Sequence, residues 1–130
     1  MLRPRVRLLL PAVLVLALAG CSGGGDTTGE PTSVGTPGDD GILRVTGTDN
    51  LQWDPGALGA PAGEITFELA CGERVNHNLV VDVDGERTTV AECGPDGTDQ
   101  GTLGLEAGEY SFVCTIPGHE SSMRGSLAVG

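Results

Sequence analysis

Residues 110–123 read YSFVCTIPGHESSM and combine a strand pattern with an unusual group of donor atoms. Tyr110, Phe112 and Cys114 occupy alternate positions, which predicts a half-buried β-strand with Cys114 on its inner face. His119 and Met123 follow in the loop, so a thiol, an imidazole and a thioether fall within ten consecutive positions. We therefore expect a strand that delivers soft donor atoms to the loop at its end.

The remainder of the folded part shows the same period-two alternation and no helical periodicity. Six or seven short strands without a long helix predict an all-β protein, either a β-sandwich or a small barrel. Residues 51–59 stay open between strand, loop and a single helical turn, and residues 93–100 are polar and rich in turn signals. The alternating segments are residues 43–46, 64–69, 77–83, 87–91, 103–105, 110–114 and 126–129.

A second imidazole belongs to the strand predicted at residues 77–83. His77 shares the inner face of that strand with Leu79 and Val81. Both His77 and Cys114 lie at an end of their strand, where the interior of a sandwich opens towards the loops. We therefore expect the two residues in a buried pocket at one pole, which is what a rigid metal site needs.

The inventory of cysteines narrows the choice of donors. The chain has four, and Cys21 is assigned to a lipid by the N-terminal motif described below. Disulfides are expected in an exported protein. Cys71 and Cys93 are the expected pair because both lie at strand ends or in loops, although the sequence does not fix this connectivity. Cys114 is then the thiol without a partner, which indicates a reactive or metal-bound sulfur.

Each candidate donor also has an ordinary explanation. A lone cysteine is often a small buried apolar residue, a single methionine often fills the core, and a loop histidine is often solvated. Together, however, His77, Cys114, His119 and Met123 include both histidines of the chain. Zinc would need a fourth donor stronger than a thioether, and a catalytic Cys–His pair would need an oxyanion hole and a substrate cleft. Two imidazoles, a thiolate and a weak axial thioether instead match an electron-transfer copper site.

Two segments resemble the cupredoxin (type 1 blue copper) family: CTIPGHESSMRGSLAV at residues 114–129 and VNHNLVV at residues 75–81. The Cys-x4-His-x3-Met spacing is more similar to azurin and auracyanin than to plastocyanin, and the resemblance extends over most of residues 42–129. It implies a Greek-key β-sandwich of six to eight strands. It also implies His77, Cys114 and His119 as equatorial copper ligands and Met123 as the axial ligand.

The resemblance further implies roles for residues around the metal. Asn78 matches a family asparagine that ties the two ligand loops together through hydrogen bonds around Thr115. Asn76 stands where azurin offers a backbone carbonyl as a distant fifth contact, although the sequence just before His77 departs from azurin. A Cys71–Cys93 disulfide does not match the amino-terminal disulfide of azurin and would be particular to this subgroup.

The N-terminal residues indicate export. Three arginines precede an apolar run that is too short for a membrane span, which predicts a signal peptide over residues 1–20. Residues 18–21 read LAGC and resemble the lipobox of bacterial lipoproteins, in which the cysteine after the cut is acylated; an ordinary signal peptide is the alternative. Residues 21–41 predict a flexible linker with a reach of roughly 25 Å. Residues 42–130 then form the folded domain.

The charge balance limits the possible partners. The whole chain carries a net charge of −11, and loss of the three N-terminal arginines makes it −14. The chain contains no lysine, so nucleic acid is not an expected partner, because binding to its backbone needs a basic face. An acidic surface favours a partner with a basic patch, or simply provides solubility.

These observations lead to one expected function and one alternative. We expect a monomeric electron carrier that cycles one copper ion between Cu(II) and Cu(I) and exchanges electrons with redox proteins. A lipid anchor would hold it on the outer face of the bacterial cytoplasmic membrane, at the cell surface or in the periplasm. The alternative is a copper-binding lipoprotein that scavenges, stores or delivers copper. Multicopper oxidases and copper nitrite reductases need further histidines, so we do not expect an enzyme.

Overall fold

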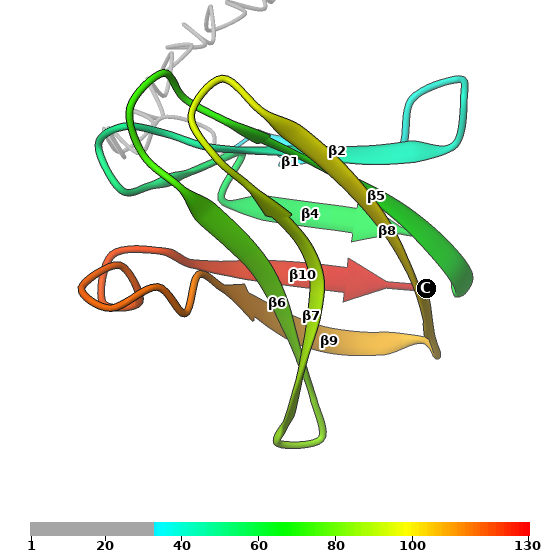
Figure 1. The fold of residues 1–130 in the computed structure, drawn as a ribbon. Helices are drawn as coiled ribbons and strands as arrows, with labels where there is room; N and C mark the ends of the chain where they lie inside the picture. Colours follow the sequence, from blue (N-terminus) through cyan, green and yellow to red (C-terminus); the bar gives the residue numbers. More distant parts are fainter. Residues whose placement is uncertain (1–32) are drawn as a thin grey trace, which may run out of the picture.

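The computed structural model describes residues 33–130, which form a β-sandwich of ten strands in two sheets (Figure 1). The predicted all-β sandwich is therefore confirmed. No helix in this described part is long and apolar enough to cross a membrane. The predicted signal peptide and Cys21 lie outside the described residues.

One sheet has six strands and the other has four. The six-stranded sheet has the order β1-β4-β10-β9-β6-β7 and the four-stranded sheet the order β3-β2-β5-β8. The strand bounds are β1 Val34–Gly35, β2 Ile42–Gly47, β3 Trp53–Asp54, β4 Ala57–Ala60, β5 Gly63–Cys71, β6 His77–Val83, β7 Glu86–Cys93, β8 Thr98–Leu105, β9 Gly108–Val113 and β10 Arg124–Val129.

The core lies between the two sheets and is built from the inward positions of the alternating segments. Leu43 and Val45 of β2 and Phe67 and Leu69 of β5 face Phe112 and other apolar residues of the six-stranded sheet, and all are buried. Burial of apolar area at alternate positions is what fixes strand register, because a slip by one residue would turn each of these side chains towards water. The same register sets the direction of the donor side chains.

Three short strands, β1, β3 and β4, add to the elements that the sequence predicts. β3 lies within residues 51–59, the segment whose structure the sequence leaves open, and β4 begins in this segment and ends at Ala60. β8 begins at Thr98, inside the segment that looks turn-rich, because its polar residues form the exposed end of a strand paired with β5. Strand formation here is set by pairing with a neighbour and not by local apolar alternation.

The third short strand corrects the predicted linker. β1 lies within residues 21–41, and Val34 and Gly35 pair in parallel with Ala57 and Leu58 of β4. Gly35 permits this pairing, since a Cβ there would stand 2.6 Å from the ring of Pro55 and 2.9 Å from Leu58. The last part of the predicted flexible linker is therefore an edge strand of the sandwich, and the folded part begins before Ile42.

Candidate metal centre

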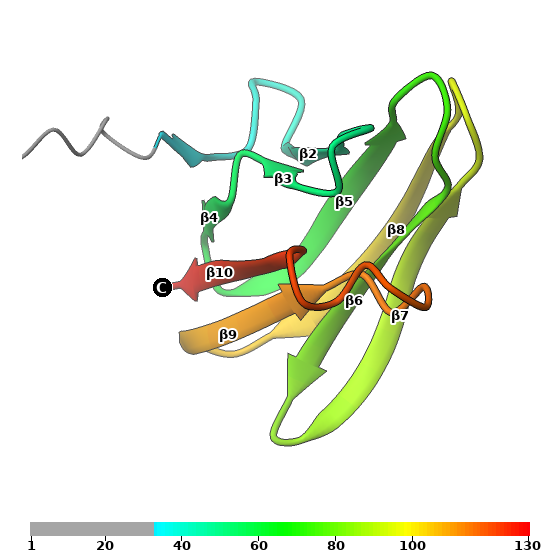
Figure 2. The same ribbon diagram turned by 90° about the vertical axis from the view of Figure 1, so that its left-hand side faces the viewer.

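One end of the sandwich carries the loops that contain the predicted donors. These are residues 48–52, 72–76, 94–97 and 114–123, and we call this end the ligand pole. Figure 2 looks towards it, with the loop between β9 and β10 in front. The opposite end carries the β6–β7 turn at residues 84–85 and the β8–β9 turn at residues 106–107. Because β6 begins and β9 ends at the ligand pole, His77 and Cys114 arrive there from neighbouring strands.

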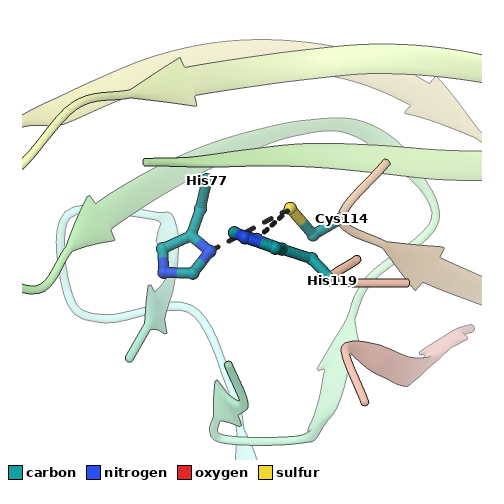
Figure 3. Close-up of side chains that lie close together, drawn as sticks. All are labelled: His77, Cys114 and His119. Atoms are coloured by element: carbon teal, nitrogen blue, oxygen red, sulfur yellow. Dashed lines mark hydrogen bonds between the residues drawn. The ribbon is translucent and has the colours of Figure 1, made fainter. Parts of the chain in front are cut away.

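Three of the predicted donors converge at this pole (Figure 3). The Cys114 Sγ lies 3.6 Å from Nδ1 of His119 and 4.0 Å from Nδ1 of His77. The ligand atoms of the three residues all lie within 4.8 Å of one another. His77 is 1% exposed and Cys114 is fully buried, whereas His119 is partly exposed. The group is thus closed towards the core and reaches solvent through His119.

Met123, the fourth predicted donor, closes the loop. Its side chain is fully buried in the core, and its backbone is bonded to the other two loop donors. The Met123 N–H donates to the His119 carbonyl at 3.0 Å, and the Met123 carbonyl accepts from the Cys114 N–H at 3.2 Å. These two bonds bring the methionine beside the cysteine although nine positions separate them in the chain.

His77 is oriented by the backbone carbonyl of the residue that directly follows β2. Its Nε2 lies 3.0 Å from the Thr48 carbonyl oxygen. Since a carbonyl can only accept, Nε2 carries the proton and Nδ1 is left with a lone pair directed at Cys114. A hydrogen bond to the distal ring nitrogen is a general device for fixing the tautomer and the ring orientation of a metal-binding histidine.

The backbone next to Thr48 makes room for this ring. A Cβ on Gly47 would stand 2.4 Å from Cδ2 of His77, so only glycine allows β2 to approach the imidazole so closely. On another side, the Trp53 ring packs at a centroid distance of 6.2 Å from the His77 ring. Burial lowers the pKa of His77, so the imidazole is neutral at neutral pH, which is the state that can donate to a metal.

Asn78 links the strand of His77 to the loop of the other donors. Its side-chain N–H donates to the Thr115 hydroxyl at 2.8 Å, and its side-chain oxygen accepts from the Thr115 N–H at 2.7 Å. The hydrogen bonds that the resemblance implied are therefore present. Both side-chain polar atoms of one amide are used, so the separation between residues 78 and 115 is fixed at two points.

The expected disulfide is present, and it ties the two sheets together beside the site. Cys71 ends β5 in one sheet and Cys93 ends β7 in the other. Cys93 is the register partner of His77, and Cys114 is the one free cysteine of the described residues.

Asn76 is exposed and borders an open cleft of about 320 Å³ with Glu92 and Ile116. Among the described residues, no side-chain hydrogen bond joins Asn76 to a donor.

Sequence reasoning missed several residues that shape the site. Thr48 acts through its carbonyl, which any residue has, so no side-chain pattern points to it. Gly47 ends a strand and looks like an ordinary turn glycine; only the close approach of the His77 ring reveals its role. Glu120 accepts from Arg124 at 3.1 Å and from Arg87. The i,i+4 spacing of Glu120 and Arg124 is a visible signal, whereas Arg87 comes from another strand.

The chemical type of the donor atoms indicates which metal ion the site fits. Two imidazole nitrogens and a buried thiolate suit a borderline or soft ion, and a weak thioether as the remaining donor is typical of copper and not of zinc. The residues present therefore fit a type 1 copper ion held by His77, Cys114, His119 and Met123.

Comparison with known proteins agrees with this donor set. Residues 41–130 match the family described as copper binding proteins, plastocyanin/azurin family. A curated relative, the copper-resistant cuproprotein CopI of Rubrivivax gelatinosus, is 29% identical over 122 residues, which cover 75% of this chain and 74% of the relative.

Solved structures share the fold at lower identity. Auracyanin A of Chloroflexus aurantiacus superposes with a TM-score of 0.59 at 21% identity, covering 68% of this chain and 98% of its own. An azurin from Methylomonas sp. strain J gives a TM-score of 0.57 at 18% identity, with coverages of 68% and 97%.

Proposed function

This chain belongs to the plastocyanin/azurin family of copper-binding proteins, and on that premise we propose that it is a one-electron carrier. The observation that carries the proposal is the contrast in exposure within the donor set. His77, Cys114 and Met123 are buried, and His119 alone is partly exposed. A bound copper ion would supply the Cu(II)/Cu(I) couple. The chain would keep the ligand geometry fixed and connect the ion to a redox partner through one exposed ligand, His119.

The frame around the donors resists movement. His77 is held by the Thr48 carbonyl, by contact with Gly47 and by strand pairing with Cys93. The loop donors are held by their own backbone bonds and by the Asn78–Thr115 pair. Imidazoles suit the oxidised ion and sulfur donors suit the reduced one. A frame that keeps both kinds of donor in place lets the protein change oxidation state with little rearrangement, which favours fast transfer.

His119 supplies the surface through which a redox partner would dock. The side chain lies in the loop of residues 114–123 beside the half-buried Ile116 and the exposed Pro117. A small apolar contact surrounded by polar residues suits a weak, transient encounter of the kind that electron-transfer proteins make. We propose redox proteins as partners, docking at this loop, with basic patches that complement the acidic domain.

We further propose that Cys21 is acylated after export and that the lipid holds the domain at the outer face of the cytoplasmic membrane. The support is the LAGC motif that follows an arginine-rich start and an apolar run. An acyl anchor would concentrate the carrier where membrane-bound redox enzymes work.

A second candidate function is copper binding for resistance, storage or delivery without electron transfer. The specific observation in its favour is the similarity to a protein named for copper resistance. In this donor set only His119 is partly exposed and the other three donors are buried. This argues for the carrier, because a protein that gives up its metal needs donors that a recipient can reach.

The experiment that tests the carrier is spectroscopic and electrochemical. Addition of one equivalent of Cu(II) should produce an intense visible thiolate-to-copper band that Cys114→Ser abolishes. Met123→Gln should lower the reduction potential and Met123→Leu should raise it, because the first adds a harder axial donor and the second removes one. A potential that is the same in both variants would argue against the axial role of Met123.

A further inference from the structure

The exposed donor, His119, lacks the ring support that the buried histidine has. The Nε2 of His77 is held by the Thr48 carbonyl. Among the described residues, the ring of His119 makes one polar contact, at 3.6 Å to the Sγ of Cys114. A metal-binding histidine usually gives its other ring nitrogen a hydrogen-bond partner, which fixes the ring. The position of His119 must therefore be set through its backbone.

The backbone of His119 belongs to a tight turn. The His119 carbonyl accepts from the N–H groups of Ser122 at 3.1 Å and of Met123 at 3.0 Å. It also accepts from the Ser122 hydroxyl at 3.2 Å. The His119 N–H donates to the Ile116 carbonyl at 2.9 Å. Because these bonds join residues 116–123 into one unit, a group that anchors the turn also anchors His119.

Glu120, the residue after His119, connects this turn to two strands of the six-stranded sheet. Its Oε1 accepts from Nη2 of Arg124 at 3.1 Å and from Nη2 of Arg87. Arg124 begins β10, whereas Arg87 lies in β7. The sheet order β10-β9-β6-β7 places these two strands three spacings apart, which is roughly 14 Å at the usual strand separation. The carboxylate therefore bridges the sheet across β6 and β9, and we call this arrangement the Glu120 bridge.

The Glu120 bridge lies on the outer face of the sheet. Phe112 points into the core, so Val113 and its register partner Arg124 point outwards. The same alternation along β6 sends Asp82 and its register partner Arg87 outwards. Both guanidinium groups, and the carboxylate between them, are therefore outside the sandwich and not in its core.

Two apolar side chains on the same outer face are nevertheless buried. Val80 and Val113 are register partners in β6 and β9, and neither belongs to the core cluster. An outward side chain is buried only where other groups cross the outer face. The groups that bond across β6 and β9 are Glu120 and its two arginines, and Figure 2 shows the loop that carries Glu120 in front of β6. The bridge and its turn therefore cover the two valines.

Arg87 makes this bridge although another carboxylate stands directly opposite it. Asp82 faces Arg87 on the neighbouring strand and on the same side of the sheet. In the described part of the chain no ion pair joins the two, and the Asp82 Oδ1 accepts from the Gly85 N–H at 2.9 Å. A single exposed ion pair contributes little to stability, but two guanidinium groups that meet at one oxygen restrain its position from two sides. Asp82 provides a matched control, because it is an outward carboxylate outside the bridge.

We propose that Glu120 is a positioning residue for His119: its carboxylate, bound by two arginines, holds the turn on the outer face of the sheet. The exposed donor then keeps its place when the copper ion changes oxidation state. The inference rests on the proposed electron carrier and adds the residue that limits movement at its exposed end. The two histidines are thus fixed by different means, His77 through its ring and His119 through its turn.

The test compares Glu120→Gln with Asp82→Asn in the full-length, copper-loaded protein. Each variant replaces one outward carboxylate by an amide, so the change in net charge is the same. In the reduced protein, amide hydrogen exchange measured by NMR should be about two- to tenfold faster at Ser122 and Met123 in Glu120→Gln, because two charged contacts of the turn are lost. Exchange at Thr115, which lies outside the turn, should not change. Asp82→Asn should match the unaltered protein at all three amides.

A second measurement follows the metal ligands themselves. In the oxidised protein, electron–nuclear double resonance resolves the couplings of the two histidine nitrogens to copper. Glu120→Gln should shift or broaden one of these couplings and leave the other unchanged, and electron self-exchange should become slower. Arg87→Gln cuts the connection to β7 and keeps the ion pair with Arg124. This variant should therefore give an effect between those of Glu120→Gln and the unaltered protein.

The outcomes separate the role of Glu120 from the electron carrier. Equal exchange at Ser122 and Met123 in Glu120→Gln, Asp82→Asn and the unaltered protein would overturn the positioning role. Faster exchange with unchanged nitrogen couplings would overturn it as well, because the turn would then move without its histidine. If the unaltered protein binds copper but does not exchange electrons, the proposed carrier is wrong. The amide exchange and the nitrogen couplings would still decide whether Glu120 holds the exposed donor.

Discussion

The two halves of the metal site are built in different ways. The loop of residues 114–123 supplies Cys114, His119 and Met123 from one short stretch and is held mainly by hydrogen bonds within itself. His77 comes from another strand and is held by contacts that are distant in sequence. The Thr48 carbonyl lies 29 positions away, and the disulfide partners Cys71 and Cys93 belong to different sheets.

The difference separates what a local motif can do from what the fold must do. The loop can bring three donors together wherever its two ends are held by neighbouring strands. His77 needs both sheets in the correct relative position, because its ring faces β2 while its backbone pairs with β7. Changes near His77 should therefore affect the whole sandwich and the metal together, whereas changes in the loop should affect mainly the metal.

Removal of the disulfide should give the largest loss of stability. The bridge closes a loop with a sequence separation of 22, for which the chain-entropy account predicts a loss of about 3 kcal/mol in the free energy of unfolding. We expect the Cys71→Ser/Cys93→Ser variant to unfold at clearly lower denaturant concentration. It should still form the visible copper band, because Cys114 is untouched, but it should bind copper more weakly, because Cys93 is the register partner of His77. An unchanged unfolding midpoint would show that the strand pairing alone holds the frame.

Gly47→Ala should disturb His77 specifically. The added methyl would stand 2.4 Å from the imidazole, and overpacking of this kind costs about 1–3 kcal/mol. We expect a weaker copper affinity and an altered copper spectrum, because the ring must move away from the Thr48 carbonyl.

Gly104→Ala is the matched control for the glycine at position 47. Gly104 also lies in a strand, and a Cβ there meets nothing within 4 Å. This variant should keep the stability and copper spectrum of the unaltered protein. If both glycine variants behave alike, the close approach of β2 to His77 has no importance for the site.

Asn78→Ala should uncouple the two halves with the smallest effect on stability. Both hydrogen bonds to Thr115 are lost, at a cost of about 1–2 kcal/mol. We expect the copper site to persist with a shifted reduction potential and a wider spread of geometries, measurable as broadened electron paramagnetic resonance lines. Asn76→Ala is the control, since Asn76 is exposed and its side chain bonds no donor. A shift of equal size in the control would contradict the linking role of Asn78.

The sequence predicted the local half of the site more completely than the distant half. The donors of the loop follow from their spacing, and His77 follows from the inventory of imidazoles and from strand alternation. Gly47 and Thr48 could not be found in this way, because one acts by lacking a side chain and the other through its backbone. Their roles exist only once β2 lies against β6.

The fold shows the same division. The longer strands have enough alternating apolar residues to be predicted one by one. β1 has only two residues, in a stretch of linker composition, and forms because the edge of β4 offers unpaired backbone groups and Gly35 fits against Pro55. Its strand identity depends on a neighbour about 20 positions away, so no local pattern could have shown it.

The account is tested most directly by a redox cycle of the copper-loaded full-length protein in the presence of a strong Cu(I) chelator. The visible band should vanish on reduction with ascorbate and return undiminished on reoxidation, with no copper transferred to the chelator. That result follows from a buried donor set that holds the ion in both oxidation states. Transfer of the copper to the chelator on reduction would contradict the electron carrier and favour a protein that delivers copper.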